Sequence, residues 1–109
     1  MKNLIVFLLS ALTLCLSAAC HRNDMRTETF RIEQMRNPES VQLLSKALQP
    51  LGGVKKITPD FEGRELIVEF NGLSLYKKNI EYAIVHAGFS LPHWPAPEAA
   101  KADLPEELR

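Results

Sequence analysis

Residues 54–72, VKKITPDFEGRELIVEFNG, contain a hairpin around which the rest of the fold is organised. The apolar residues that predict its two strands are Val54, Ile57 and Phe61, followed by Leu66, Val68 and Phe70. Glu62 and Gly63 provide the turn between them. Pro59 has no N–H to donate to a neighbouring strand, so the first of the two strands is expected at an edge of its sheet.

A helix is predicted before the hairpin. Asn37, Pro38 and Glu39 form a helix start, with a capping side chain, a proline at the first helical position and an acid in the first turn. The apolar residues that recur along one helical face are Val41, Leu44, Leu48 and Leu51. Gly52 and Gly53 are expected to end this helix.

A second helix is predicted after the hairpin, capped by Ser74 and ended by Gly88 at the position that favours glycine. The residues expected on its buried face are Tyr76, Ile80, Ala83, Ile84 and Ala87. An alternating stretch around Phe30 and Ile32 predicts an opening strand, and residues 89–91 predict a short closing strand.

The element order is therefore βαββαβ, over residues 27–91. Two right-handed crossovers of this kind predict an α+β, ferredoxin-like fold: a four-stranded antiparallel sheet with two helices on one face. The remaining residues 92–109 form a proline-containing tail, and we expect its charged, alanine-rich part at residues 97–109 to be mobile. Trp94 is expected to pack at the open end of the sheet.

The first twenty residues predict an export signal. Lys2 precedes an apolar run at residues 4–16, which is shorter than the roughly 20 residues that span a bilayer and is typical of a signal peptide. Residues 16–20, LSAAC, resemble a bacterial lipobox, although Leu16 lies one place further from the cysteine than is usual. Ordinary cleavage, leaving Cys20 as a free thiol, is the alternative.

We therefore expect a signal peptide at residues 1–19, a lipidated Cys20 and a polar tether at residues 20–26. The mature protein would be anchored to a bacterial membrane through its lipid and would face the periplasm. Cys15 would be lost with the signal peptide, so no thiol would remain for a disulfide or a metal.

Charge and residue pattern exclude two classes of function. Thirteen basic residues balance thirteen acidic ones and form no basic stripe, which argues against nucleic-acid binding. No Ser-His-Asp or Cys-His arrangement is recognisable, so we expect no enzyme activity and no catalytic residues.

The folded segment resembles the heavy-metal-associated domain, the βαββαβ module of copper chaperones, mercury-binding proteins and metal-pumping ATPases. The residues and stretches that carry the resemblance are Phe30-Arg31-Ile32, Met35, Leu51-Gly52-Gly53-Val54, Val68-Glu69-Phe70, and Ile80, Ile84 and Ala87-Gly88-Phe89. The resemblance implies a metal site with the motif M-x-C-x-x-C in the first loop. Here Met35 is kept, but the two cysteine positions hold Asn37 and Ser40.

This replacement removes the thiolates that hold soft ions such as Cu(I), because an amide oxygen and a hydroxyl are neutral, hard donors near neutral pH. Asn37 and Ser40 are better suited to capping the helix. The other candidate donors, all weak, are Met35, His86 and His93. Met35 is expected to lie in the core and His86 on the surface, while His93 either packs beside Trp94 or reaches a partner.

Two functions remain. The residues favour a binding module without a cofactor, which contacts another protein of the cell envelope. The resemblance implies the alternative, an accessory in metal homeostasis that binds or passes Cu(I) or another heavy-metal ion.

Overall fold

The structure is a computed structural model that describes residue 3 and residues 24–109. Apart from residue 3, the predicted signal peptide and lipobox lie outside the described residues, as does most of the tether. Within the described part, no helix is both long and apolar enough to cross a membrane.

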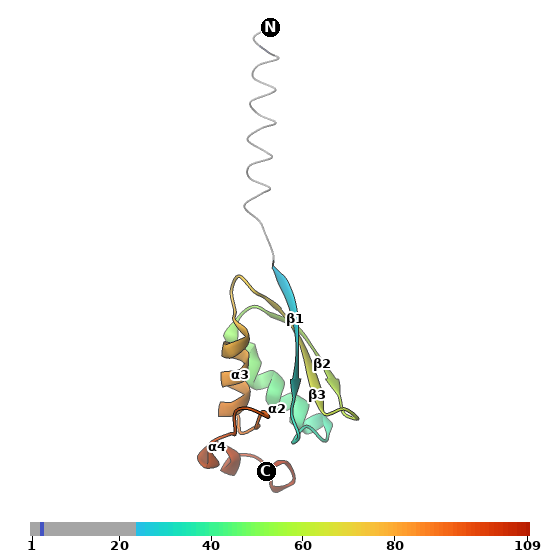
Figure 1. Ribbon diagram of the computed structural model, residues 1–109, viewed down its shortest axis with the longest axis vertical. Coiled ribbons are helices and arrows are strands. Elements are labelled where there is room, and N and C mark those ends of the chain that lie inside the picture. The colour runs from blue at the N-terminus through green and yellow to red at the C-terminus, as the bar shows by residue number, and fades with distance from the viewer. Residues whose placement is uncertain (1–2, 4–23) are drawn as a thin grey trace.

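The main layers are a sheet and two helices that lie on one face of it (Figure 1). The strands are β1 (Met25–Arg31), β2 (Val54–Asp60) and β3 (Glu65–Asn71), and the helices are α2 (Pro38–Leu48) and α3 (Lys77–His86). A short 3₁₀ turn, η1 (Gln49–Leu51), follows α2. Both strand pairs are antiparallel in the order β1-β3-β2, so the α+β fold and the hairpin are confirmed.

The predicted edge position of the Pro59 strand is also confirmed, because β2 pairs only with β3 among the described strands. The prediction of a fourth strand is wrong. Instead of pairing with β1, the chain after Phe89 forms an isolated bridge between Leu91 and Trp94. Pro92 and Pro95 cannot donate a backbone hydrogen bond, which disfavours a continuous strand at this position. The sheet of the described residues therefore has three strands.

Helix α3 begins later than the sequence predicted. A turn in which the Ser74 and Leu75 amides both donate to the Asn71 carbonyl precedes the helix. The cap is Tyr76, whose amide donates to the Asn79 side chain at 3.0 Å. Ser74 is therefore not the cap, and Tyr76, 75% exposed, is not part of the buried face.

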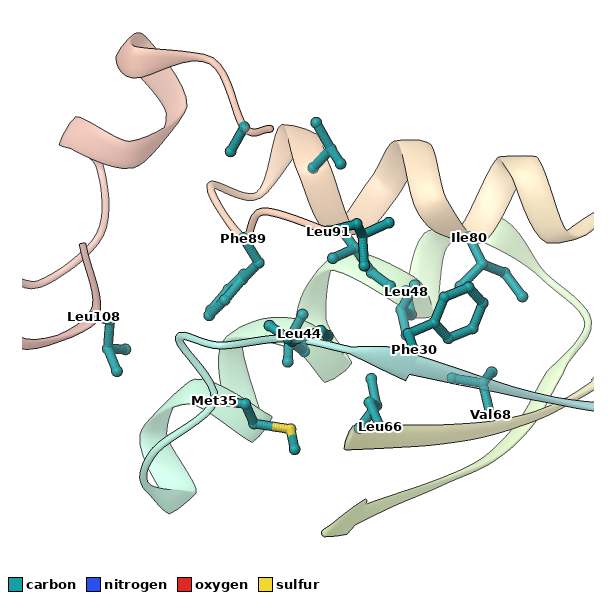
Figure 2. Packing of buried hydrophobic residues seen from close by; sticks show 14 of the residues in the cluster. Phe30, Met35, Leu44, Leu48, Leu66, Val68, Ile80, Phe89, Leu91 and Leu108 are labelled. Atoms are coloured by element: carbon teal, nitrogen blue, oxygen red, sulfur yellow. The ribbon is translucent and has the colours of Figure 1, made fainter. Parts of the chain in front are cut away.

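Buried side chains between the sheet and the helices form one core, part of which Figure 2 shows. Its fully buried members include Ile32, Leu44, Leu66, Ile80 and Ile84. The predicted strand residues Phe30 and Phe70 are buried as well. Trp94 is half-buried and packs against this core.

The C-terminal tail also belongs to the core, contrary to the expectation that it is mobile. It forms a short helix, α4 (Glu98–Ala102), and a 3₁₀ turn, η2 (Glu106–Leu108). Leu104 is 4% exposed and Leu108 is 0% exposed, so both leucines of the tail are buried. Gly88 ends α3 with φ 102°, as predicted, and this backbone conformation lets the tail approach closely. A Cβ at Gly88 would lie 2.7 Å from the Ala100 carbonyl oxygen.

Candidate functional site

The loop between β1 and α2 carries the positions at which the resemblance implies a metal motif. Its Met35 is 0% exposed, and its thioether lies in the core below α2 (Figure 2). The Met35 amide donates to the Ile32 carbonyl at 3.1 Å, which folds the loop back on the end of β1. Met35 therefore fits the core role expected from the sequence.

Asn37 and Ser40 cap α2 by bonding to each other. The Ser40 amide donates to the Asn37 side-chain oxygen at 2.9 Å, and the Ser40 hydroxyl donates to the Asn37 carbonyl at 2.5 Å. The Asn37 amide in turn donates to the Ser40 hydroxyl at 3.4 Å. Ser40 is 0% exposed. The side-chain oxygens at the two positions where the resemblance implies cysteines are thus committed to the helix start.

A buried glutamine in the same loop holds the chain that follows α3. The Gln34 amide nitrogen donates to the Gly88 carbonyl at 2.8 Å, and its oxygen accepts from the Ser90 amide at 2.6 Å. Gln34 is 7% exposed. This side chain links the first loop to residues 88–90 where the predicted fourth strand is missing. Gln34 is one of two polar residues between Ile32 and Met35, and nothing in the sequence signalled this role.

The C-terminal tail lies against the end of the domain that contains the loop between β1 and α2. The Arg36 guanidinium donates to the Glu107 carbonyl at 3.5 Å. Figure 2 shows Leu108 at the end of the core that Met35 and Phe89 occupy. The loop between β1 and α2 is therefore in contact with the C-terminal tail.

The two histidine candidates lie on or beside α3. The His86 ring stacks on Tyr82 with ring centroids 3.8 Å apart, and its Nδ1 lies 3.0 Å from the Tyr82 carbonyl oxygen. The His93 Nε2 contacts the carboxylate of Glu81, which is buried. Trp94 meets Tyr82 edge to face at 6.2 Å.

The candidate donors are not assembled into a metal site in the described part of the chain. Residues 24–109 contain no group of three or more His, Cys, Asp or Glu side chains arranged to hold a metal ion. Met35 is fully buried, whereas His86 and the His93 ring are exposed. Cys15 and Cys20 lie outside the described residues.

Arginines dominate the electrostatics at the β1 end of the loop. Arg31 lies 2.8 Å from one carboxylate oxygen of Glu33, and Arg64 lies 3.1 Å from the other. The hydrogen bond and charge of Arg31, with a smaller contribution from Arg64, lower the pKa of Glu33. Glu33 is therefore ionised near neutral pH, and each of its two carboxylate oxygens is paired with an arginine.

Neither a protein-family profile nor a curated protein matches this chain. Solved structures do. Oxidized MerP from Ralstonia metallidurans CH34 is 24% identical with a TM-score of 0.56, over 63% of this chain and 99% of that one. A putative copper-ion-binding protein from Bacillus anthracis is 20% identical with a TM-score of 0.58, over 64% and 99%. Apo-CopP from Helicobacter pylori is 23% identical with a TM-score of 0.55, over 61% and 98%.

Almost the whole of each of these proteins is matched, while about a third of this chain is not. At this level of identity the likeness establishes the architecture. The chain therefore has the fold of the heavy-metal-associated metallochaperones, the family that its sequence resembles.

Proposed function

We propose that this chain is an exported, lipid-anchored, non-catalytic module of the bacterial cell envelope that uses the heavy-metal-associated fold to bind a protein. The observation that carries the proposal is the reciprocal capping of α2 by Asn37 and Ser40 at the two positions where the family has cysteines. These side chains stabilise the fold in place of a metal ion.

The residues present do not fit a soft metal ion. To act as ligands, Asn37 and Ser40 would have to leave the helix start, and the loss of such a cap costs about 1 kcal/mol. What they would then offer is two neutral oxygens, whereas thiolates supply polarizable, negatively charged donors. Met35 would in addition have to leave the core, where it is 0% exposed.

The predicted anchor restricts where the module would work. Met25, the first residue of β1, lies five positions after Cys20. A fully extended chain covers about 3.4 Å per residue, so lipidation at Cys20 would hold Met25, at the start of β1, within about 17 Å of the membrane surface. The partner would accordingly be a membrane protein or a protein at that surface.

Metal binding or transfer is the alternative, and the likeness in fold to a putative copper-ion-binding protein is the observation that favours it. A titration of residues 21–109 with Cu(I) against a colorimetric chelator, under reducing conditions, separates the two functions. Zn(II) is tested in the same way. The double variant Asn37→Cys/Ser40→Cys, which restores the family's motif, is the matched positive control.

We expect the native chain not to compete with the chelator for either ion, and the double-cysteine variant to take up one Cu(I) per chain. The proposal is refuted if the native chain removes a stoichiometric amount of metal from the chelator. A variant that fails to bind although it folds would show that the loop, and not only its donors, has lost the geometry for a metal.

A further inference from the structure

The end of the domain at which β1 begins exposes large apolar side chains. Three of the five large hydrophobic residues that are exposed in the described part of the chain lie here. They are Met25, which is 50% exposed, Leu73, which is 64% exposed, and Tyr76, which is 75% exposed. Single exposed apolar residues are ordinary on a protein surface, whereas a group of them at one end of a fold indicates a contact surface.

Hydrogen bonds join the start of β1 to the turn that follows β3. The Gly72 amide donates to the Asp24 carbonyl at 2.7 Å. Figure 1 shows this turn at the end of the sheet where β1 begins. The turn is ordered, because the Leu73 amide donates to the Asn71 side-chain oxygen at 3.0 Å and Leu75, which is 5% exposed, packs in the core. Leu73 is therefore exposed from a turn that the fold holds in place.

The tether end, which comprises residues 24–28, 52–56 and 69–78, is positively charged. It contains five lysines and arginines and three acidic residues, a net charge of +2. The other described residues contain six basic and ten acidic side chains, a net charge of −4. Charge in the described domain is thus divided between a basic tether end and an acidic remainder.

Three of the five cations at the tether end are available to a ligand. Arg26 pairs with Asp24 at 3.0 Å and Lys77 pairs with Glu28 at 3.6 Å, so these two are already engaged. The other three are exposed and form no ion pair with any described residue: Lys55, Lys56 and Lys78. Lys56 lies opposite Glu69 in the strand register, which leaves Lys55 and Lys78 as the least compensated cations.

This end of the domain is also the one closest to the predicted lipid anchor. Three residues, 21–23, separate Cys20 from Asp24, where the described domain begins. An extended chain of that length reaches about 14 Å, so a lipid on Cys20 would keep Asp24 within that distance of the bilayer. The hydrogen bond between Gly72 and Asp24 brings Leu73 to the same end. Apolar side chains, tyrosines and lysines are the groups that bind the interface of an anionic bilayer.

We propose that the tether end lies on an anionic bilayer, with Met25, Leu73 and Tyr76 in the interface and the exposed lysines beside the lipid phosphates. This inference rests on the lipid anchor of the proposed function and names the surface that the anchored domain presents to the membrane. Strand β1 has seven residues and spans about 20 Å, and the loop before α2 lies beyond its far end. The contact therefore orients the domain so that this loop faces away from the bilayer and stays accessible to a partner protein.

The test uses the lipidated mature chain, purified from the membranes of an expressing bacterium and placed in bilayer nanodiscs. One set of discs contains phosphatidylcholine and phosphatidylglycerol in equal amounts, and the other contains phosphatidylcholine alone. A lipid with a gadolinium chelate on its headgroup broadens the NMR signals of residues that approach the bilayer. In the anionic discs we expect broadening at Leu73 and Tyr76 but not at Phe61, which is 40% exposed in the turn at the opposite end of the sheet. In the neutral discs the broadening should decline.

An apolar variant tests the contact with the interface. Leu73→Ser/Tyr76→Ser should lower the ratio of domains docked on the bilayer to free domains, measured from the broadening, at least about tenfold, because two apolar side chains no longer leave water. Serine is a favoured helix cap, so the change at Tyr76 preserves the start of α3. Phe61→Ser is the matched control and should leave the ratio unchanged.

A neutralised variant tests the contact with the phosphates. Lys55→Gln/Lys78→Gln should lower the same ratio at least about tenfold in the anionic discs, because each lysine near such a surface contributes about fivefold in affinity. Arg31→Gln/Arg64→Gln changes the net charge equally at the opposite end of the sheet and should leave the ratio unchanged.

Equal broadening at Leu73, Tyr76 and Phe61 would show that the domain moves freely on its anchor and would overturn the proposal. Equal effects of the lysine and arginine variants would overturn it as well. Signals of Leu73 and Tyr76 that change with protein concentration instead of lipid would assign the surface to a second copy of the chain.

The mass of the mature chain tests the anchor independently of the orientation. A chain without acyl groups would remove both the lipid anchor of the proposed function and the orientation that depends on it. A lipidated chain without a preferred orientation would refute the orientation alone. Neither outcome changes the metal titration, which tests the choice between protein binding and metal carriage.

Discussion

Replacing Leu108 by alanine tests whether the C-terminal tail is part of the folded core. Leu108 is 0% exposed, although only one residue follows it. That last residue is held in place, because the Arg109 guanidinium donates to the Leu104 carbonyl at 2.8 Å and to the Ala102 carbonyl at 2.9 Å. The end of the chain is thereby restrained around the Leu108 side chain.

The magnitude follows from the size of the cavity and from how far it can collapse. Buried leucines that are replaced by alanine cost about 2–5 kcal/mol, with the smaller values where the surroundings relax. The short 3₁₀ turn η2 relaxes more easily than a central helix, so we expect a loss of about 2–3 kcal/mol in the free energy of unfolding for Leu108→Ala. In a domain of this size, that corresponds to a fall in Tm of about 10–20 °C.

Urea denaturation measures the loss, with the fluorescence of the single tryptophan, Trp94, as the signal. Trp94 is half-buried against the core and should therefore report unfolding. Leu73→Ala is the matched control, because Leu73 is 64% exposed and the chemical change is the same. If Leu108→Ala lies within about 0.5 kcal/mol of Leu73→Ala, the tail does not contribute to the core and the reasoning is refuted.

Three further predictions concern the loop, the end of α3 and the ion pairs. Asn37→Ala removes the cap of α2 and should cost about 1 kcal/mol in urea denaturation; an unchanged midpoint would contradict the capping role. Gly88→Ala should cost more than Gly52→Ala: both glycines have positive φ, but a Cβ at Gly88 would lie 2.7 Å from the Ala100 carbonyl oxygen, whereas a Cβ at Gly52 would meet nothing within 4 Å. Equal losses in thermal unfolding would disprove the close contact. Because the pKa of Glu33 is lowered on folding, its ionised form stabilises the protein above the ordinary value of 4.5, and this contribution is lost as the pH falls below that value. The stability difference between the native chain and Glu33→Gln should therefore shrink in acid, and a constant difference would contradict the assignment.

The parts of the fold that the sequence predicted correctly are those determined by local chemistry. Pro59 lacks an N–H, and this alone restricted its strand to an edge. Asn37 followed by Pro38 specified a helix start because both residues act within one turn. Gly88 marked the end of α3 for the same reason, since its φ of 102° is one that other residues rarely adopt.

The parts that were missed depend on contacts between distant residues. Phe89 and Leu91 alternate as strand residues do, and both are buried, but the chain turns at Leu91–Trp94 and leaves the ladder. The hydrogen bonds that a fourth strand would have made at its start come from Gln34, more than fifty positions away in the sequence. The spacing of apolar residues along the sequence cannot predict that the side chain of Gln34 makes hydrogen bonds that a neighbouring strand would otherwise make.

The tail was missed for a different reason. Its alanines, charges and prolines are typical of an exposed segment, and its short helix α4 contains no fully buried residue. The contribution comes from two buried leucines, Leu104 and Leu108, that lie outside α4. Leu104 packs so close to Gly88 that a Cβ there would lie 2.9 Å from its side chain. The candidate site was predicted better: the capping role of Asn37 and Ser40 followed from the loop itself, and the burial of Met35 followed from the resemblance to the heavy-metal-associated domain.

This chain differs from a four-stranded domain of the same fold in two ways: the edge of β1 is open, and a tail contacts the loop before α2. One change in the chain accounts for both. Beginning at Pro92, the residues leave the edge of β1 and continue as the tail that reaches the loop end of the core. The edge of β1 is left open as a result, and the motif loop is contacted by the tail, through Arg36 and the Glu107 carbonyl. A segment that would have completed the sheet instead packs against the end of the core at which the loop between β1 and α2 lies. The open edge of β1 and the contact between the tail and the loop are, on this reasoning, two consequences of the same diversion.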